Sequence, residues 1–470
     1  MHQFLVSAAH KSSGKTTLSI GLAAALRERG LAVQTFKKGP DYIDPLWLGL
    51  AAGRPCRNLD FFLSSHEEIL AQYARHSAGA EVCLVEGNKG LYDGLALDGV
   101  NSNAALAHLL ALPVILVLDA RGMTRGIAPL ILGYQAFDRG IRIAGVILNR
   151  LGGSRHESKL RAVVEHYTDV SVVGAVAEDS RMGILERHLG LMPANESSAA
   201  VERIGEISRR IAQQVDLDRL LALTASAAPL PPQALPQRRT PGPTVRIGVA
   251  RDEAFGFYYA DDMEALAAAG AQIVPFDALR DVRLPEVDAL FIGGGFPEYF
   301  MDALSANVAL RSEILHRIES GMPAYAECGG LMYLARTLTW KGETRTMTGA
   351  IAADIVMHDK PVGRGYVKLL PTADHPWPHE PATEDEIRCH EFHYSSIENL
   401  PPDTRYAYRV SRGHGIDGER DGIVYKNLLA SYSHLRSTAA HDWAARFVAF
   451  IRQCMAGRGV AASASQPRAA

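Results

Sequence analysis

The sequence lacks the features that mark several large classes of protein. Its five cysteines are an odd, scattered set without a C-x-x-C pair, which argues against a disulfide framework or a zinc ribbon and for a reducing compartment. A formal net charge of −3, with no long basic stretch, argues against a basic surface that binds nucleic acid. No apolar run reaches membrane-spanning length, and the N-terminus lacks the layout of a signal peptide. We therefore expect a cytoplasmic protein without a nucleic-acid or membrane partner.

What is present is the composition of a large globular protein. Of the 470 residues, 47% are hydrophobic and 21% are charged, and no internal repeat is visible. This length exceeds one ordinary domain, so we expect a first domain over residues 1–226 and a second over 245–456. The proline-dense stretch 227–244 cannot hold a regular helix or a central strand and is interpreted as an interdomain linker. The small and polar residues 457–470 are expected to form a disordered tail.

Apolar, strand-like runs alternate with helical segments through the first half of the chain. We expect strands over residues 4–7, 33–36, 82–86, 114–119, 145–148 and 170–176. This alternation predicts an α/β fold with a doubly wound parallel sheet, whose ligands bind at the carboxyl ends of the strands. The polar residues that follow these strands are therefore the ones to consider for a site.

The first strand leads into a predicted phosphate-binding loop. Residues 4–17 read FLVSAAHKSSGKTT, which is an apolar strand, a small and polar loop and the start of a helix. Backbone N–H groups around Gly14 and at the helix N-terminus suit polyphosphate oxygens. Lys15 supplies a positive charge, the Thr16 hydroxyl can reach a Mg2+ ion, and Thr17 completes the motif. The loop predicts a nucleotide site.

The loop after the second strand combines two cations with two acids. Lys37 and Lys38 suit anionic oxygens, and Asp41 and Asp44, which flank Tyr42, could hold a metal or orient a substrate. A charged surface turn is the alternative interpretation of this loop.

Two further strand ends carry candidate residues. Glu86 stands at the end of the third expected strand, where a phosphate-loop enzyme places a Mg2+ ligand, directly or through water. Asn149 ends a later strand and could read an adenine edge, or could instead cap a helix.

The second half of the chain carries a candidate nucleophile. In YAECGGLMYL at 325–334, Cys328 lies at a sharp turn between an expected strand and an expected helix. Such an elbow exposes the sulfur, and the helix N-terminus behind it favours the thiolate. Backbone N–H groups of Gly294 or Gly295, in a glycine turn, could form an oxyanion hole with that of Gly329. An inert core cysteine is the alternative.

A nucleophilic cysteine requires a base. His434 is favoured because it follows an apolar run and precedes the last helix, expected over residues 439–455. His390 and His393 are its rivals. Their spacing also suits a metal site, but alternating residues in a strand-like stretch equally suit substrate contacts or structure.

Together these motifs resemble the glutamine-dependent a,c-diamide synthases that act on cobyrinic or hydrogenobyrinic acid in corrinoid biosynthesis. The matching pieces span nearly the whole chain in the order of that family. They are GKTT at 14–17, KKGPDYIDP at 37–45, VEGNKGLYDG at 85–94, ERHLGLMP at 186–193, GGGFPE at 293–298, YAECGGLMYL at 325–334, CHEFHYS at 389–395 and HGIDGERDGIVYKNLLASYSH at 414–434.

The resemblance implies a fold and a reaction. It implies a dethiobiotin-synthetase-like P-loop domain followed by a class I glutamine amidotransferase domain of flavodoxin-like α/β fold. Cys328 falls on the family's nucleophile and His434 on its histidine. The substrates implied are glutamine, ATP with Mg2+ and a tetrapyrrole polycarboxylate, whose a and c acetates become acyl phosphates and then amides. Ammonia would pass between closely packed domains, and a homodimer is the default expectation.

Three positions depart from the usual patterns. Ala9 replaces a glycine of the phosphate loop, and His10 fills the register of the signature lysine of related ATPases. Arg436 stands where class I glutaminases often carry the glutamate that orients the histidine. Alternatives left open are a sirohaem or sirohydrochlorin amidase, an amidotransferase acting on an unrelated carboxylate, a partition-type switch ATPase, and a regulatory protein with an inactive glutaminase half.

Overall fold

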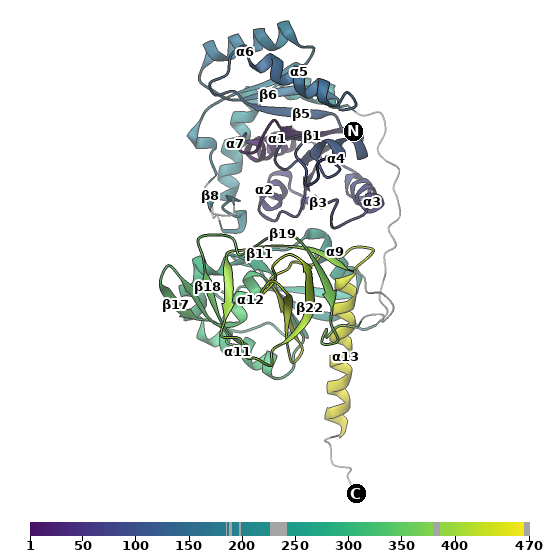
Figure 1. Cartoon of the computed structure of the whole chain (residues 1–470), viewed down its shortest axis with the longest axis vertical. Coiled ribbons are helices and arrows are strands. Elements are labelled where there is room, and N and C mark those ends of the chain that lie inside the picture. Colours follow the sequence, from purple (N-terminus) through teal and green to yellow (C-terminus); the bar gives the residue numbers. More distant parts are fainter. Residues whose placement is uncertain (185, 188–189, 197–198, 226–241, 379–385, 465–470) are drawn as a thin grey trace. The chain divides into compact units, whose positions relative to one another are not determined.

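The computed structural model describes residues 1–184, 186–187, 190–196, 199–225, 242–378 and 386–464 (Figure 1). The chain divides into two compact units, Met1–Leu235 and Pro236–Ala470. Most of the expected linker at 227–244 lies outside the described residues, as do residues 188 and 189 of the ERHLGLMP motif.

The first unit is built on a seven-stranded sheet in the order β3-β2-β4-β1-β5-β6-β7, and every strand pair in it is parallel. The strands are β1 (His2–Ala8), β2 (Val33–Lys38), β3 (Arg57–Leu59), β4 (Val82–Glu86), β5 (Val114–Asp119), β6 (Ile143–Leu151) and β7 (Ser171–Ala177). The prediction of a doubly wound parallel sheet is confirmed. The additional strand β3 was not predicted, because it has only three residues and contains no apolar run.

Helices cover both faces of this sheet. They are α1 (Lys15–Glu28), α2 (Ile43–Ala52), α3 (His66–Ser77), α4 (Asn103–Leu109), α5 (Ile127–Phe137), α6 (Ser154–Tyr167), α7 (Ala200–Gln214) and α8 (Leu217–Thr224). Alternate residues of a strand point to opposite faces, so Phe4 and Val6 of β1 pack with α1, α2, α7 and α8, while Leu5 packs with α3, α4, α5 and α6. A small hairpin, β8 (Glu186–Arg187) and β9 (Gly190–Leu191), completes the unit.

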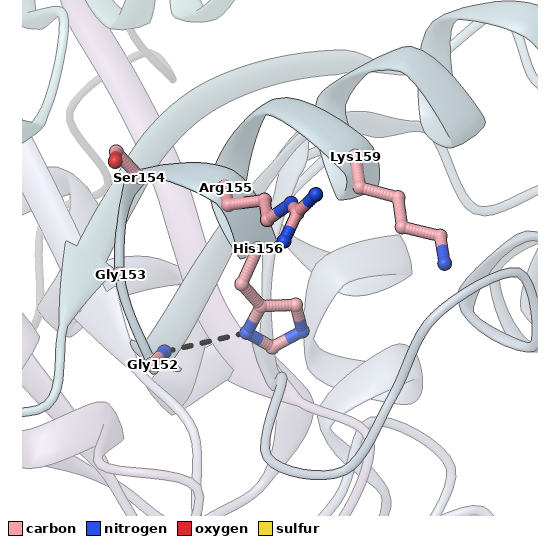
Figure 2. Close-up of a pocket in the computed structure, with 6 residues that line it drawn as sticks. All are labelled: Gly152, Gly153, Ser154, Arg155, His156 and Lys159. Carbon is pink, nitrogen blue, oxygen red and sulfur yellow. Dashed lines mark hydrogen bonds between the residues drawn. The ribbon is translucent and has the colours of Figure 1, made fainter.

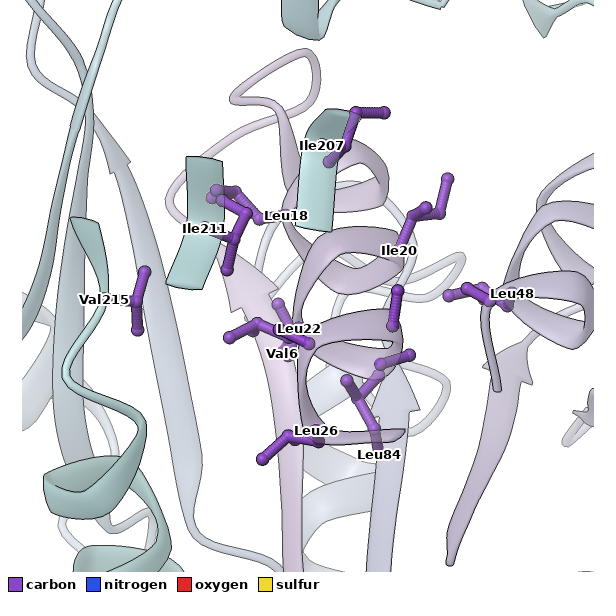
Figure 3. Close-up of a cluster of buried hydrophobic side chains, with 14 of the residues drawn as sticks. Val6, Leu18, Ile20, Leu22, Leu26, Leu48, Leu84, Ile207, Ile211 and Val215 are labelled. Atoms are coloured by element: carbon purple, nitrogen blue, oxygen red, sulfur yellow. The ribbon is translucent and has the colours of Figure 1, made fainter. Parts of the chain in front are cut away.

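The face that carries α1 is densely packed, and this packing fixes the helix that starts at the phosphate loop. Figure 3 shows the side chains that meet there: Val6, Leu84, Leu18, Leu22, Leu26, Ile207 and Ile211. A Cβ on Gly21 of α1 would overlap side-chain atoms of Ile211 on α7, so the two helices approach closely at this glycine. The N-terminus of α1 is therefore held rigidly against the sheet.

The second unit is built on a nine-stranded mixed sheet in the order β12-β10-β13-β15-β24-β23-β22-β19-β20. The parallel strands are β10 (Val245–Ala250), β12 (Ala271–Phe276), β13 (Ala289–Ile292), β15 (Ala324–Glu327) and β24 (Leu428–Ser431). Taken in chain order they are arranged 2-1-3-4-5, which is the flavodoxin-like order and confirms that expectation. The antiparallel strands are β19 (Gly363–Pro371), β20 (Ile387–His393), β22 (Arg405–Arg412) and β23 (Arg420–Tyr425).

Further elements surround this second sheet. The helices are α9 (Ala260–Ala268), α10 (Met301–Ala306), α11 (Val308–Glu319), α12 (Gly329–Leu334) and α13 (Trp443–Ala464), with the 3-10 turn η3 (Pro297–Phe300). A four-stranded sheet contains β16 (Ala335–Trp340), β17 (Glu343–Thr346), β18 (Ile351–Met357) and β21 (Ser395–Glu398). A two-stranded pair joins β11 (Phe255–Phe257) to β14 (Gly294–Gly295).

The last helix corrects two expectations. It begins at Trp443 rather than at residue 439, and it continues to Ala464. The helix thus includes residues 457–464, which were expected to belong to a disordered tail at 457–470. Residues 465–470 lie outside the described part of the chain. Among the described residues, no helix is both long and apolar enough to cross a membrane.

Candidate functional site

The phosphate loop lies between the end of β1 and the first turn of α1. Ser12 has a φ of 61° and Gly14 a φ of 86°, so the loop turns through the left-handed region just before Lys15. The Nδ2 atom of Asn149 donates a hydrogen bond to the carbonyl of Ser13 at 2.8 Å, and a Cβ on Gly14 would overlap that nitrogen. Glycine is required here by both backbone angle and space. Thr17 lies in the first turn of α1.

Two residues at the end of β6 hold the loop from the side. Asn149 contacts the loop as described, and Arg150 donates hydrogen bonds to the carbonyl of Ser12 and to Asp119 Oδ2, both at 2.8 Å. The structure thus places Asn149 directly against the phosphate loop, with its amide nitrogen engaged by Ser13. Reading of an adenine edge by Asn149 stays a prediction.

A buried cluster of one lysine and two acids lies beside the loop. Lys37 Nζ lies 2.5 Å from Asp44 Oδ2 and 2.7 Å from Glu86 Oε1. Thr16 Oγ1 donates to Glu86 Oε1 at 2.8 Å and lies 3.3 Å from Asp44 Oδ2. The second oxygen of Glu86, Oε2, is buried without a hydrogen-bond partner among the described residues. Residues predicted from three separate segments, namely the phosphate loop, the loop after the second strand and the end of the third expected strand, are therefore brought into one cluster.

The charges of this cluster perturb one another. Burial lowers the pKa of Lys37, but the carboxylates of Asp44 and Glu86 outweigh it and raise that pKa well above its ordinary value. Burial and the nearby Lys37 lower the pKa of Lys15. Burial and the charge of Asp44 raise the pKa of Asp41 to about 7. The pKa of Asp44 is lowered, because Lys37 outweighs the effect of burial.

Lys38 is buried, it donates to two neutral amide oxygens, and the charge of Asp60 offsets part of the effect of burial on its pKa. Its Nζ lies 3.1 Å from Asn101 Oδ1 and 3.3 Å from Asn88 Oδ1. Burial lowers its pKa to about 8. Tyr42, the other expected substrate contact, is buried immediately before α2.

A pocket of about 670 Å3 lies at the start of α6 (Figure 2). It is lined by Gly152, Gly153, Ser154, Arg155, His156 and Lys159. His156 is held in place because its Nδ1 accepts from the Gly152 N–H at 3.3 Å and its Nε2 lies 2.8 Å from the Met123 carbonyl. The sequence reasoning missed this pocket, although the glycine pair directly after β6 was a signal for it.

In the second unit, Cys328 lies at the elbow between β15 and α12. Its φ of 47° and ψ of −103° are strained for a residue with a side chain, a feature that clusters at functional sites. A Cβ on Gly330 would overlap the carbonyl of Ile292, and one on Gly329 would lie 3.0 Å from the nitrogen of Gly295. The turn thus packs tightly on the end of β13, which brings the expected oxyanion-hole segments together.

His434 is the histidine that the structure places at the cysteine. A hydrogen bond joins the Cys328 and His434 side chains, and His434 Nδ1 lies 3.3 Å from Glu327 Oε2. Burial lowers the pKa of His434, but its bonds to Cys328 and Glu327 outweigh this and raise that pKa to about 10. A Cβ on Gly294 would lie 2.7 Å from Cε1 of the ring, so the histidine also borders the glycine turn.

The two rival histidines have other partners. His390 stacks on His434 with ring centroids 4.9 Å apart, and its Nδ1 lies 3.3 Å from the Tyr259 hydroxyl. Burial lowers the pKa of His390 well below its ordinary value. His393 stacks on Tyr432 at 3.7 Å. Neither belongs to a cluster of three potential metal ligands among the described residues, so the alternative of a metal site there finds no support.

Glu327 is the residue of this site that the sequence reasoning left without a role. It is the last residue of β15 and directly precedes Cys328. The one sequence feature that could have indicated a role for it is this position of an acid next to the nucleophile. In the structure it is 3% exposed and contacts His434.

Comparison with known proteins identifies the family. Residues 5–190 match the CobQ/CobB/MinD/ParA nucleotide binding domain, and residues 246–441 match the CobB/CobQ-like glutamine amidotransferase domain. A cobyrinate a,c-diamide synthase of Magnetococcus marinus is 47% identical over 457 residues, covering 96% of this chain and 97% of that protein. Relatives of the same name from Methanosarcina acetivorans and Archaeoglobus fulgidus are each 41% identical and cover 94% and 93% of this chain and 94% of each relative. The resemblance seen in the motifs is confirmed: the chain belongs to the cobyrinate a,c-diamide synthase family and is a glutamine-dependent, amide-forming ligase.

Proposed function

We propose that this chain amidates the a and c acetates of cobyrinate or hydrogenobyrinate, with ATP and glutamine as co-substrates. The observation that carries the proposal is 47% identity with a cobyrinate a,c-diamide synthase over 96% of the chain. Similarity of this extent runs through the nucleotide unit and the glutamine unit alike, so it supports the whole coupled reaction rather than one half.

In the glutamine unit, Cys328 acts as nucleophile and His434 as its acid and base. The raised pKa of His434 keeps the imidazole protonated near neutral pH, and an imidazolium stabilises a thiolate beside it. The thiolate attacks the side-chain amide carbon of glutamine, a C–S bond forms, and the carbonyl electrons move to oxygen. His434 then donates its proton to the nitrogen as the C–N bond breaks, and ammonia leaves. Neutral His434 next takes a proton from the water that attacks the thioester, which releases glutamate and the thiolate.

The oxyanion of each tetrahedral intermediate is held by backbone N–H groups. The proposed donors are those of Gly294 or Gly295 and of Gly329. Two observations support them: the Cβ position of Gly329 lies 3.0 Å from the Gly295 nitrogen, and the His434 ring borders Gly294. Preorganised amides at this place stabilise charge only as it develops.

In the nucleotide unit, ATP binds along the phosphate loop with its Mg2+ ion. The hydroxyl of Thr16 and the carboxylates of Asp44 and Glu86 are the oxygen ligands that Mg2+ prefers. The buried Oε2 of Glu86, which has no hydrogen-bond partner in the described part of the chain, fits such an ion. When bound, the ion neutralises charge on the phosphates. Lys15 and the backbone N–H groups of Gly14 to Thr17 hold the phosphate oxygens. Lys37 holds both acids in place.

The adenosine of ATP is proposed to occupy the pocket at the start of α6. That pocket opens at the carboxyl end of β6, where parallel sheets bind their ligands. Asn149 and Arg150 directly precede it in the chain and contact the phosphate loop, so base, ribose and phosphates would follow one continuous edge.

The tetrapyrrole carboxylate is proposed to bind at Lys38, near Asp41 and Tyr42. Lys38 Nζ is buried against two neutral amide oxygens, so an anionic ligand would offset part of the cost of burying its charge. The carboxylate oxygen attacks the γ-phosphorus of ATP, and ADP leaves. Ammonia then attacks the acyl carbon, phosphate leaves, and an amide remains.

Mass spectrometry of products tests this proposal. The chain is incubated with Mg-ATP, glutamine and, in turn, cobyrinic acid, hydrogenobyrinic acid, sirohydrochlorin or sirohaem. We expect two acid-to-amide mass changes on a corrin. Amidation of sirohaem or sirohydrochlorin alone would keep the catalytic assignments and change the acceptor. No product with any acceptor, although glutamine is hydrolysed, would overturn the proposed acceptor class.

A further inference from the structure

The position that normally orients the catalytic histidine of a class I glutaminase holds an arginine here. A histidine that transfers a proton through one ring nitrogen is usually fixed by a hydrogen bond at the other. Arg436 lies over the ring of Tyr259 and donates to Asp261 Oδ2 at 2.6 Å. A guanidinium has only donors, so Arg436 cannot accept a hydrogen bond from His434.

Glu327 supplies an acceptor from a different element. Its Oε2 lies 3.3 Å from His434 Nδ1, and both side chains are 4% exposed. Its other oxygen, Oε1, accepts hydrogen bonds from the Tyr325 hydroxyl at 2.5 Å and from the Leu435 N–H at 2.9 Å. These two donors fix the plane of the carboxylate and so aim Oε2 at the imidazole.

The backbone around this pair is equally constrained. Glu327 is the last residue of β15 and lies opposite Ser431 of β24, whose carbonyl accepts the Cys328 N–H at 2.7 Å. The His434 N–H donates to the His390 carbonyl at 2.8 Å, and the two rings stack. The nucleophile, the histidine and Glu327 therefore share one rigid frame.

We propose that Glu327, the residue before the nucleophile, positions His434 for proton transfer in place of the usual glutamate. The proposal rests on the roles proposed above for Cys328 and His434 and adds a third member to them. Because the bond to Glu327 uses Nδ1, Nε2 is left to serve the sulfur and the departing ammonia. Glu327 acts through His434 and is therefore a positioning residue.

A purely structural role is the competing explanation, since the bond from the Leu435 N–H also ties β15 to the segment after β24. The pH profile separates the two. The carboxylate favours the imidazolium, so its loss lowers the pKa of His434 and moves the alkaline limb of kcat/KM for glutamine to lower pH. A structural defect lowers kcat/KM for glutamine at every pH but leaves the pH of the alkaline limb unchanged.

Other titratable or charged groups near the pair are Cys328, Tyr258, Asp262, Tyr325, Cys389, His390, Tyr408 and Arg436. Burial raises the pKa of Asp262 to about 8 and the charge of Glu327 adds to this, so Glu327→Gln also lowers the pKa of Asp262. Burial holds the pKa values of the three tyrosines and of Cys389 above their ordinary range.

The test compares variants of the full-length enzyme. In Glu327→Gln we expect glutamine-dependent kcat to fall about 10²–10⁴-fold, with KM for glutamine little changed and the alkaline limb at lower pH. Amidation from added ammonia should stay at the wild-type rate, because it bypasses the glutamine site. Glu327→Asp keeps the charge at shorter reach. It should give an intermediate kcat with the wild-type limb, and it serves as the test if the glutamine variant folds poorly.

Glu391→Gln is the matched control. Glu391 is a second buried acid of the same unit, and it accepts the His414 and Gly415 N–H groups at 2.7 Å each. Its replacement should lower thermal stability without moving the limb. An unshifted limb in Glu327→Gln, or glutamine-dependent activity within a few-fold of wild type, would overturn the role of Glu327. Full glutamine-dependent activity in Cys328→Ala would instead overturn the proposed nucleophile.

Discussion

Glu86→Gln removes one charge from the buried cluster of the nucleotide unit and keeps its shape. Glu86 Oε1 accepts from Lys37 at 2.7 Å and from Thr16 at 2.8 Å, and its side chain is fully buried. In the variant, Lys37 keeps Asp44 at 2.5 Å as its near carboxylate. The proposed Mg2+ site loses one anionic oxygen ligand.

The stability cost follows from these contacts. Removing one partner of a buried ion pair costs about 3–5 kcal/mol when the other charge is left alone. Because Lys37 keeps Asp44, we expect the loss of a single charge-assisted hydrogen bond, about 2 kcal/mol. For a unit of this size that lowers the midpoint of thermal unfolding by about 4–8 °C.

The effect on activity should be larger and confined to one half-reaction. We expect amidation to fall about 100-fold or more with either glutamine or ammonia, and the Mg2+ concentration required for ADP release to rise. Hydrolysis of glutamine, measured in the same samples, should continue. Glu81→Gln is the control, because Glu81 directly precedes β4, is exposed, and its carboxylate accepts the backbone N–H of Ala32 at 2.9 Å outside the buried cluster. A Glu86→Gln enzyme with wild-type rate and wild-type Mg2+ dependence would refute the reasoning.

Four further changes test the remaining assignments. Cys328→Ala should abolish glutamine use while ammonia at high pH still supports amidation, and loss of both would contradict the nucleophile. Lys15→Ala should abolish amidation from either nitrogen source in the mass assay, whereas full activity would exclude the phosphate site. Asn149→Ala loses the bond to the Ser13 carbonyl and should raise the KM for ATP about fivefold, the equivalent of about 1 kcal/mol; an unchanged KM would show that the loop does not depend on it. Burial lowers the pKa of His441 to about 3, so the unfolded chain binds a proton below about pH 6.5 that the folded chain excludes. Stability should therefore decline as pH falls from 6.5 toward 3, and His441→Phe should lessen the decline between unfolding scans at pH 7 and pH 5. An equal decline in the variant would exclude His441 as its source.

The strands and the two turns that carry the proposed sites were predictable because their signals are local. Each of these signals predicts the backbone conformation of the few residues that contain it. They are apolar runs of strand length, a glycine before Lys15 and two glycines after Cys328. The structure has a strand at each of the six places expected in the first unit. The family resemblance rested on the same local motifs in a fixed order.

The partners of the site residues were not predictable in the same way. Lys37 was expected to meet substrate anions, but it lies opposite Glu86 in the pairing of β2 with β4 and is held between two acids. That pairing depends on which strands become neighbours in the sheet, and no short stretch of the sequence contains this information. The antiparallel strands β19, β22 and β23 were not predicted for a related reason, since they follow Cys328 in the chain but lie beyond β24 in the sheet.

Both units use an acid at the end of a central strand to fix a cation beside the proposed chemistry. Glu86 is the last residue of β4 and holds Lys37, and Glu327 is the last residue of β15 and holds His434. The end of a buried parallel strand suits this task, because the strand fixes the backbone and neighbouring loops supply donors to the carboxylate. Each cation is thereby held by a carboxylate from the adjacent strand or loop. If this reasoning is right, Glu86→Gln and Glu327→Gln should fail independently, the first with either nitrogen source and the second with glutamine alone.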